Sequence, residues 1–175
     1  MDDSFEKDGY VVIDNFLPED IAKKINEIFS SESKSNWELV EQIRSGHYGH
    51  VFKTTNPLLP SENESYSATF SRSESIENSS DFKNIVNSIF QEKVDKLFND
   101  NAFELDARAI QLTKGGHYRS HCDTYAGEIN VLYYVNQNWV WDWGGILNIC
   151  SESDEEYCKS IFPKYNRAVF LNNKK

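Results

Sequence analysis

The sequence has 175 residues, of which 39% are hydrophobic and 14% aromatic, so it is long and apolar enough to form one domain over residues 1–175. Its formal net charge of -10 argues against nucleic acid or an anionic membrane as a partner, because both need clustered Lys and Arg side chains. No membrane-length apolar stretch, secretory signal or Cys-x-x-Cys motif occurs, which favours a reduced, cytoplasmic setting without a disulfide scaffold.

The first hundred residues predict one strand and two helices. Residues 9–16 form a β-branched and aromatic run after a glycine, which is typical of a strand. Apolar residues three or four apart predict amphipathic helices over residues 18–29 and 81–98, and Ser80 or Asp81 is expected to cap the second. The first helix is expected to pack its apolar stripe against a sheet, and the second is expected to be a core helix.

The segment between these helices, residues 37–80, has no regular pattern. It contains strand-like pieces at residues 38–43 and 51–54 and a Ser/Glu-rich run. Long irregular segments often contribute binding loops. His47 and His50 lie here and are candidates for metal or substrate contacts, but loop histidines are more often simply solvated.

From residue 103 onward the apolar pattern changes to a period of 2, which predicts short strands. The predicted strands are residues 103–113, 118–123, 129–136, 146–150 and 168–171. The predicted turns and loops are residues 114–116, 124–128, 137–143 and 151–159. Helices followed by short strands favour an α+β fold with a mainly antiparallel sheet or barrel.

The candidate chemistry lies in the predicted strand over residues 118–123, which carries His121 and Asp123 separated by one residue. In an extended segment such residues point to the same face, so an imidazole nitrogen and a carboxylate oxygen converge, while Cys122 points away. The pair supplies two of the three ligands of a 2-His-1-carboxylate triad, which binds non-heme Fe(II). A surface strand with two polar residues is the alternative interpretation of the tripeptide alone.

Four sequence blocks follow one another around this pair. They are Tyr118-Arg-Ser-His-Cys-Asp123, Val131-Leu-Tyr-Tyr-Val-Asn136 with Trp139 after it, Gly144-Gly-Ile-Leu147, and Pro163-Lys-Tyr-Asn-Arg-Ala-Val-Phe170. In order and spacing they resemble the 2-oxoglutarate- and Fe(II)-dependent oxygenases, most closely the prolyl 4-hydroxylase-like branch. The resemblance implies a double-stranded β-helix (jelly-roll) core over residues 101–175, with an N-terminal strand and supporting helices in residues 1–100.

The resemblance also implies roles for individual residues. His121 and Asp123 correspond to the first two iron ligands. Tyr134 corresponds to the tyrosine that contacts 2-oxoglutarate in the prolyl-hydroxylase branch, with core packing as its alternative role. Leu147 corresponds to a residue that packs against this cosubstrate.

Other residues are assigned by their position near these ones. Tyr118 is close enough to the ligands to line the pocket, and Asn130 falls on the same strand face as Tyr134. Arg167 is expected to be a structural charge. The three tryptophans of residues 137–143 are candidates for substrate contacts or for packing.

The resemblance implies Fe(II), 2-oxoglutarate and O2 as cofactor and cosubstrates. The expected reaction is hydroxylation of a C–H bond coupled to oxidation of 2-oxoglutarate to succinate and CO2. The expected substrate is a small molecule, peptide or protein, and a prolyl residue is one candidate, because resemblance to a fold does not fix the substrate. A weaker alternative is a cupin-like metalloprotein in which His47 or His50 joins His121.

The family pattern is incomplete in this sequence. The resemblance implies a distal histidine about one strand and a turn after residues 163–170, and then an Arg or Lys for the far carboxylate of 2-oxoglutarate. No histidine follows His121, and His117 is too close along the same strand to complete the triad easily. Either the sequence is trimmed from a longer protein, since a stop within the barrel leaves an open sheet edge, or it is a catalytically inactive binding or structural module.

Overall fold

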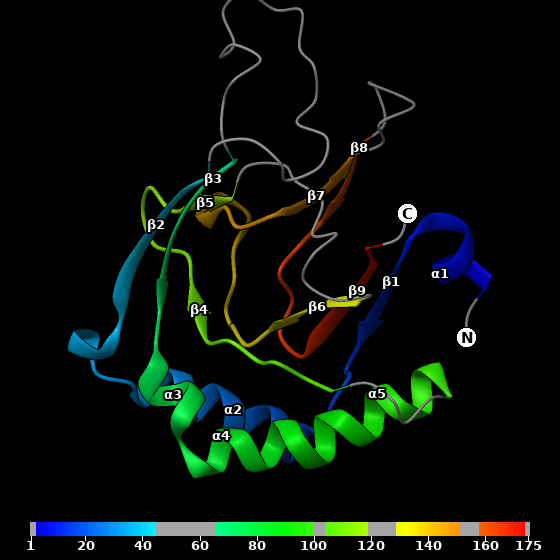
Figure 1. Ribbon diagram of the computed structural model, residues 1–175, viewed down its shortest axis with the longest axis horizontal. Coiled ribbons are helices and arrows are strands. Elements are labelled where there is room, and N and C mark those ends of the chain that lie inside the picture. The colour runs from blue at the N-terminus through cyan, green and yellow to red at the C-terminus, as the bar shows by residue number, and fades with distance from the viewer. Residues whose placement is uncertain (1–2, 45–65, 100–103, 119–128, 151–157, 174–175) are drawn as a thin grey trace, which may run out of the picture.

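The computed structural model describes residues 3–44, 66–99, 104–118, 129–150 and 158–173. The longer helices lie along one side of the molecule and the strands on the other, while the short N-terminal helix lies beside the N-terminal strand (Figure 1). The described strands form three sheets, and every pairing between them is antiparallel. The prediction of an α+β fold with antiparallel sheets is therefore confirmed.

The central sheet consists of β1 (Tyr10–Asp14), β9 (Arg167–Asn172) and β6 (Ile129–Tyr134), in the order β1–β9–β6. All three strands were predicted from their β-branched and aromatic runs. The middle strand is β9, and its residues 168–170 are fully buried. A continuous apolar run of this kind is typical of a strand covered on both faces.

The helical layer contains both predicted helices and several short ones. Its members are α2 (Glu19–Ser31), η1 (Lys34–Asn36), α3 (Glu74–Asn78), α4 (Ser80–Asn84), the π-helical η2 (Ile85–Phe90) and α5 (Gln91–Phe98). The short α1 (Asp3–Asp8) lies apart from this layer, beside β1 (Figure 1). Together α4, η2 and α5 form the predicted helix over residues 81–98. Its cap differs from the prediction, because the extended Ser79, rather than Ser80 or Asp81, accepts the hydrogen bond from Phe82 N with its side chain.

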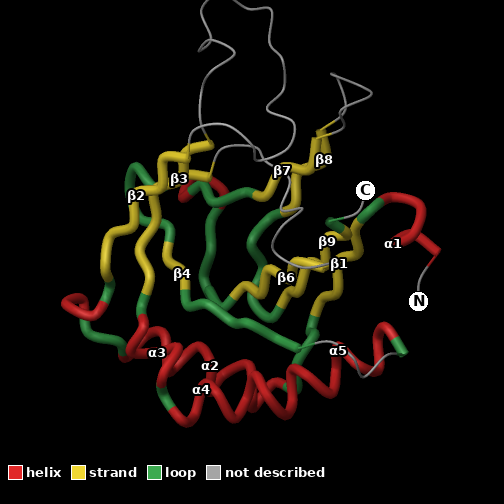
Figure 2. Tube along the Cα trace, in the orientation of Figure 1, coloured by secondary structure: helices red, strands yellow, loops and turns green. Residues whose placement is uncertain are grey.

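The main core lies between this helical layer and the central sheet, as the separation of helices and strands in Figure 2 shows. Phe170 of β9 contacts Phe16 and Phe98 edge-on, with ring centroids 5.5 and 5.6 Å apart. Phe16 in turn contacts Phe90 at 4.9 Å. These aromatic contacts join the segment after β1, the long helix and the last strand, so one face of the central sheet is closed.

A second sheet lies beside the central sheet (Figure 1). It contains β2 (Glu38–Arg44), β3 (Tyr66–Arg72), β4 (Ile110–Gln111) and β5 (His117–Tyr118). The prediction of an irregular segment over residues 37–80 was wrong for β3, which pairs with the other three strands. Ala68 and Phe70 alternate with polar residues and are buried, so this Ser/Thr-containing run has one apolar face.

The strand predicted over residues 103–113 is largely wrong, because within its described part only β4 is a strand. The backbone groups of Ala109 form hydrogen bonds outside any strand ladder. Its N–H donates to the Glu77 carboxylate at 2.9 Å, and its carbonyl accepts from Ser73 N at 3.1 Å. Glu77 is also ion-paired with Arg72, so this segment is held by a side chain instead of by a strand ladder.

The third sheet is a hairpin of β7 (Leu147–Cys150) and β8 (Cys158–Ile161). The first strand was predicted, whereas β8 begins inside residues 151–159, which were predicted to be a turn. The hairpin lies across from the central sheet, on the side opposite to the helices (Figure 1).

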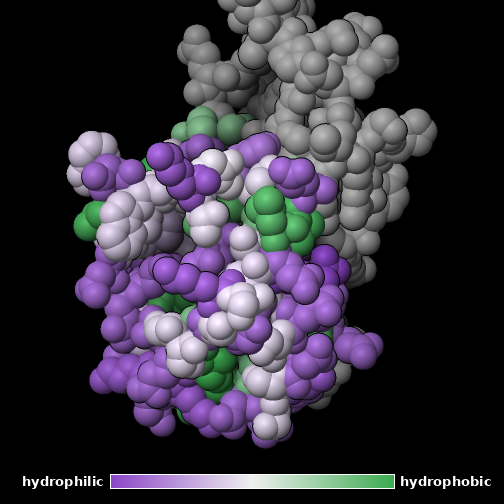
Figure 3. Space-filling view, turned by 90° about the vertical axis from the view of Figure 1, so that its left-hand side faces the viewer, coloured by the Kyte–Doolittle hydropathy of each residue, from purple (hydrophilic) through white to green (hydrophobic). Residues whose placement is uncertain are grey.

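The surface formed around β2 and β3 is mainly hydrophilic, with hydrophobic residues in small separate patches (Figure 3). None of the helices in the described ranges is both long and apolar enough to cross a membrane.

Candidate active site

The turn before β9 fixes the end of β6 that carries Tyr134. Asn166 has a positive φ of 56°, a conformation that Asn tolerates better than most residues, and its N–H donates to Tyr134 O at 3.0 Å. Its side-chain Oδ1 accepts from Leu17 N at 2.9 Å and from the Tyr133 hydroxyl at 3.0 Å, while Nδ2 donates to Leu17 O at 2.8 Å. One buried amide therefore joins β6, β9 and the start of α2.

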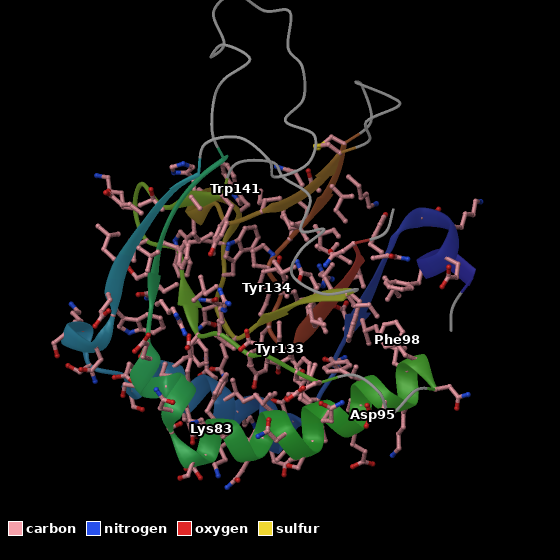
Figure 4. The ribbon with its side chains drawn as sticks, viewed as in Figure 1. Lys83, Asp95, Phe98, Tyr133, Tyr134 and Trp141 are labelled. Atoms are coloured by element: carbon pink, nitrogen blue, oxygen red, sulfur yellow. The ribbon has the colours of Figure 1, made fainter. Side chains whose placement is uncertain are left out.

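Tyr133 and Tyr134 point to opposite faces of the central sheet (Figure 4). Tyr133 faces the helices, where its ring contacts Phe90 at 5.7 Å with perpendicular planes, so Tyr133 has a packing role. Tyr134 faces away from the helices. Burial raises the pKa of Tyr134 to about 12, so its hydroxyl stays protonated and can donate a hydrogen bond throughout the physiological pH range.

The face of the central sheet that carries Tyr134 combines polar edges with an apolar centre. Asn130 lies on this face by alternation, and the fully buried Val169 occupies its middle. Beside Tyr134, Arg167 Nε and Nη2 donate to the Asp14 carboxylate at 2.7 and 3.1 Å, and Nη1 donates to a backbone carbonyl. The guanidinium is thus used inside the fold, as expected of a structural charge.

The Asp14 carboxylate accepts these hydrogen bonds from Arg167. Its hydrogen bonds with Arg167 and with Lys164, together with their positive charges, lower the pKa of Asp14 to about 2. Lys164 Nζ lies 2.9 Å from the carboxylate. Asp14 therefore stays ionised at neutral pH and fixes the edge where β1 meets β9.

The other two predicted cosubstrate residues belong to different sheets. Leu147 of β7 is half-buried and lies opposite the buried Ile161. Tyr118 of β5 stacks on Phe70, with ring centroids 5.1 Å apart and planes inclined by 15°. The predicted pocket residues are therefore spread over all three sheets.

The predicted metal ligands His121 and Asp123 lie outside the described residues, as do His47 and His50. Within the described ranges, no group of three or more His, Cys, Asp and Glu side chains is placed to hold a metal ion. The two-ligand iron site therefore stays a prediction.

The tryptophan-rich loop contains one packed and two exposed rings. Trp139 Nε1 donates to Gly144 O at 2.9 Å, and its ring lies 5.6 Å from that of Phe162. Trp141 and Trp143, in η3 (Trp141–Trp143), are 77% and 64% exposed. Packing therefore explains the first tryptophan but not the other two.

Two features of this region were not predicted from the sequence. Asn166 lies within residues 163–170 and has no predicted role, although Asn is a usual residue for a positive φ. Cys150 and Cys158 have no predicted pairing, yet β7 and β8 place them opposite each other.

Comparison with known proteins bears on this part of the chain. The family model of the 2OG-Fe(II) oxygenase superfamily matches residues 107–175, which is less than half of the chain. The matched segment includes His121, Asp123, Tyr134 and Leu147, and it extends over β4 to β9. No curated protein matches the chain.

This match supports assignment to the 2-oxoglutarate- and Fe(II)-dependent oxygenases as a class, and with it the general kind of reaction. Members of this class generally use Fe(II), 2-oxoglutarate and O2. The match is to the superfamily as a whole and does not single out the prolyl-hydroxylase branch.

Proposed function

We propose that the protein is a 2-oxoglutarate- and Fe(II)-dependent dioxygenase that hydroxylates a C–H bond of a small molecule or peptide. The observation that carries this proposal is the position of Tyr134 and Asn130. Both lie on the face of the central sheet opposite the helices, within the segment that matches the superfamily.

The arrangement of the sheets supports a jelly-roll core as part of the same proposal. The helices cover one face of the central sheet, and the β7–β8 hairpin lies on the other side (Figure 1). Two sheets on either side of an interior are the basis of a double-stranded β-helix. Tyr134, on the central sheet, and Leu147, on the hairpin, would then contribute to that interior from its two sides.

The donor chemistry around Tyr134 fits a dicarboxylate cosubstrate. A phenol that remains protonated donates a charge-assisted hydrogen bond to a carboxylate, and the Asn130 amide adds polar capacity on the same face. Leu147 would exclude water by packing against the carbon chain. Because the guanidinium of Arg167 is already paired with Asp14, it is not our candidate for the cosubstrate carboxylate.

His121 and Asp123 would hold Fe(II), through one imidazole nitrogen and one carboxylate oxygen. When bound, Fe(II) together with 2-oxoglutarate and O2 supplies oxidative decarboxylation to succinate and CO2 and hydroxylation of the substrate.

For the substrate, we propose a prolyl residue of a peptide as the first candidate to test. Trp141 and Trp143 expose flat apolar rings on η3, a few residues before Leu147. Aromatic surfaces of this kind bind proline-containing extended segments, whose backbone is already ordered before binding. The net charge of -10 supports a substrate other than nucleic acid.

The ligand assignment is tested by alanine substitution of Asp123, with His117 as the matched control. We expect Asp123→Ala to abolish Fe(II)-dependent succinate formation and to weaken Mn(II) binding in calorimetry, with an unchanged circular dichroism spectrum. His117→Ala, which removes a histidine four residues from His121, should retain both succinate formation and Mn(II) binding. Succinate formation by Asp123→Ala would show that the ligand assignment is wrong.

The cosubstrate assignment is tested by phenylalanine substitutions at two neighbouring tyrosines. Tyr134→Phe should raise the 2-oxoglutarate Kd by roughly tenfold, the effect of about one lost hydrogen bond to a charged group. Tyr133→Phe removes the hydroxyl on the helix-facing side and should lower stability without changing that Kd. If wild-type protein binds neither Mn(II) nor 2-oxoglutarate, the chain is an oxygenase-like binding or structural module instead.

A further inference from the structure

Two cysteines lie directly opposite each other where the β7–β8 hairpin leads into residues 151–157. Cys150 ends β7 and Cys158 begins β8, and the two are partners in the strand register. Their sulfur atoms are 3.6 Å apart, with the Cys150 thiol donating to Cys158 Sγ, and both side chains are exposed. Opposite residues of antiparallel strands have Cα atoms about 4.5–5.5 Å apart, which lies within the range of about 4.4–6.8 Å that a disulfide spans.

The neighbouring pair on the same face of the hairpin fixes this register. Ser160 Oγ donates to Asn148 Oδ1 at 2.8 Å, two residues along each strand from the cysteines. Rotation of the two thiol side chains is therefore enough to bring the sulfur atoms to bonding distance, because the backbone already has the required spacing.

The hairpin is also the place where a covalent link would have the most effect. Among the described strands, β7 and β8 pair only with each other, and Ile161 is their one fully buried hydrophobic residue. A two-stranded hairpin of this length is marginally stable without further support. A bond between Cys150 and Cys158 would close a short loop and remove conformational freedom from the unfolded hairpin.

We propose that Cys150 and Cys158 are a redox-active dithiol that is closed to a disulfide by a low-molecular-weight disulfide such as oxidised glutathione. In the first step one protein thiolate attacks a glutathione sulfur, forms a mixed disulfide and releases one glutathione thiolate. The second protein thiolate then attacks the cysteine sulfur of the mixed disulfide and releases the second glutathione. Two protein thiols are oxidised, and one glutathione disulfide is reduced to two thiols.

This modification site is independent of the iron and cosubstrate assignments, because it lies on the outer face of the hairpin, whereas Leu147 points to the inner face. Desolvation and the hydrogen bond to Cys158 raise the pKa of the Cys150 thiol. The exchange should accordingly become faster as the pH rises through the weakly alkaline range, where more thiolate is present.

The test is a redox titration of the wild-type protein in buffers of reduced and oxidised glutathione. Samples are quenched with acid and alkylated, and their masses are measured by mass spectrometry. We expect two thiols to become protected from alkylation together, so that the oxidised protein carries two alkyl groups fewer than the reduced protein, and peptide mapping to show a Cys150–Cys158 link. The oxidised protein should melt at a temperature higher by roughly 5 °C or more.

Cys122→Ser is the matched control and should leave the link and the stabilisation intact. Cys150→Ser and Cys158→Ser should each abolish both and leave a single glutathione adduct at the remaining hairpin cysteine. The proposal is overturned if Cys122 is a partner in the disulfide, if mixed disulfides persist in the wild type, or if both thiols stay alkylatable in oxidised glutathione.

Discussion

The central sheet and the β7–β8 hairpin show two ways in which this chain supports an antiparallel strand pair. The middle strand of the central sheet has three consecutive residues fully buried, whereas the two strands of the hairpin have one buried hydrophobic residue between them. The central sheet packs on the aromatic core and is tied by Asn166 to the start of α2. The hairpin is held mainly by its own ladder and a few side-chain contacts.

This difference determines how firmly each group of proposed binding residues is held. The proposed polar contacts of the cosubstrate, Asn130 and Tyr134, are built on the rigid sheet, so their positions are set by contacts across the whole chain. Leu147, the exposed tryptophans and the cysteine pair lie in or beside the less supported hairpin. Rigid elements place functional groups more accurately, and weakly supported elements open at lower free energy.

The sharpest test of this comparison replaces one phenylalanine in each region. Phe170→Ala should lower the free energy of unfolding by about 3–5 kcal/mol, because it removes a fully buried ring that contacts Phe16 and Phe98. Phe162→Ala, which removes a ring that is 47% exposed beside the hairpin, should cost about 1 kcal/mol or less. Urea denaturation followed by circular dichroism measures both, and equal losses would contradict the distinction between the two regions.

The next test compares two asparagines. Asn166→Ala should destabilise the protein by about 2–4 kcal/mol, because it leaves the Leu17 amide groups and the Tyr133 hydroxyl without their partner. Asn148→Ala, on the exposed face of the hairpin, should change stability by about 0.5 kcal/mol at most.

Asn166→Gly distinguishes the two contributions of Asn166. Glycine adopts the positive φ without strain, so any loss that remains is due to the side-chain hydrogen bonds. If Asn166→Gly were as stable as the wild type, backbone conformation alone would explain the residue.

A smaller effect is expected at the edge of the central sheet. The folded-state pKa of Asp14 is lowered to about 2, mainly by its hydrogen bond with Arg167, so its contribution is present above the ordinary Asp pKa of about 4. That contribution is lost as the pH falls from about 4 to about 2. Since the Asp14 side chain is 37% exposed, solvent screening limits the contribution to about 1 kcal/mol or less.

Asp14→Asn should therefore be slightly less stable than the wild type at pH 7 and should lose less stability between pH 4 and pH 2. Denaturant unfolding at a series of pH values measures this slope. Parallel stability curves for the two proteins would mean that the ion pair with Arg167 does not contribute.

The smallest expected effect on stability is that of Trp141→Ala. The ring is 77% exposed, so the free energy of unfolding should change by about 0.5 kcal/mol at most. If η3 contacts the substrate as proposed, the KM for a prolyl peptide should rise while the KM for 2-oxoglutarate stays constant. Trp139→Ala, which also removes the contact with Phe162, should lower stability more.

Local patterns in the sequence were sufficient for the central sheet and the two long helices. The strands β1, β6 and β9 and the long helix carry their apolar residues at a regular spacing, and that spacing depends only on neighbours in the chain. For the candidate site, alternation predicts that Asn130 and Tyr134 share a strand face.

Other features depended on contacts between distant parts of the chain. The strand β3 is rich in Ser and Thr and is defined by its pairing with β2, β4 and β5, while the segment before β4 is held by Glu77. Asp14 and Arg167 meet because β1 lies beside β9, and Cys150 meets Cys158 because of the hairpin register. The sequence by itself determined the two long helices and the strands of the central sheet, since their periodicity is local. Only the tertiary structure decided which polar side chains, thiols and strand edges became partners, because those pairings are fixed by packing across the whole fold.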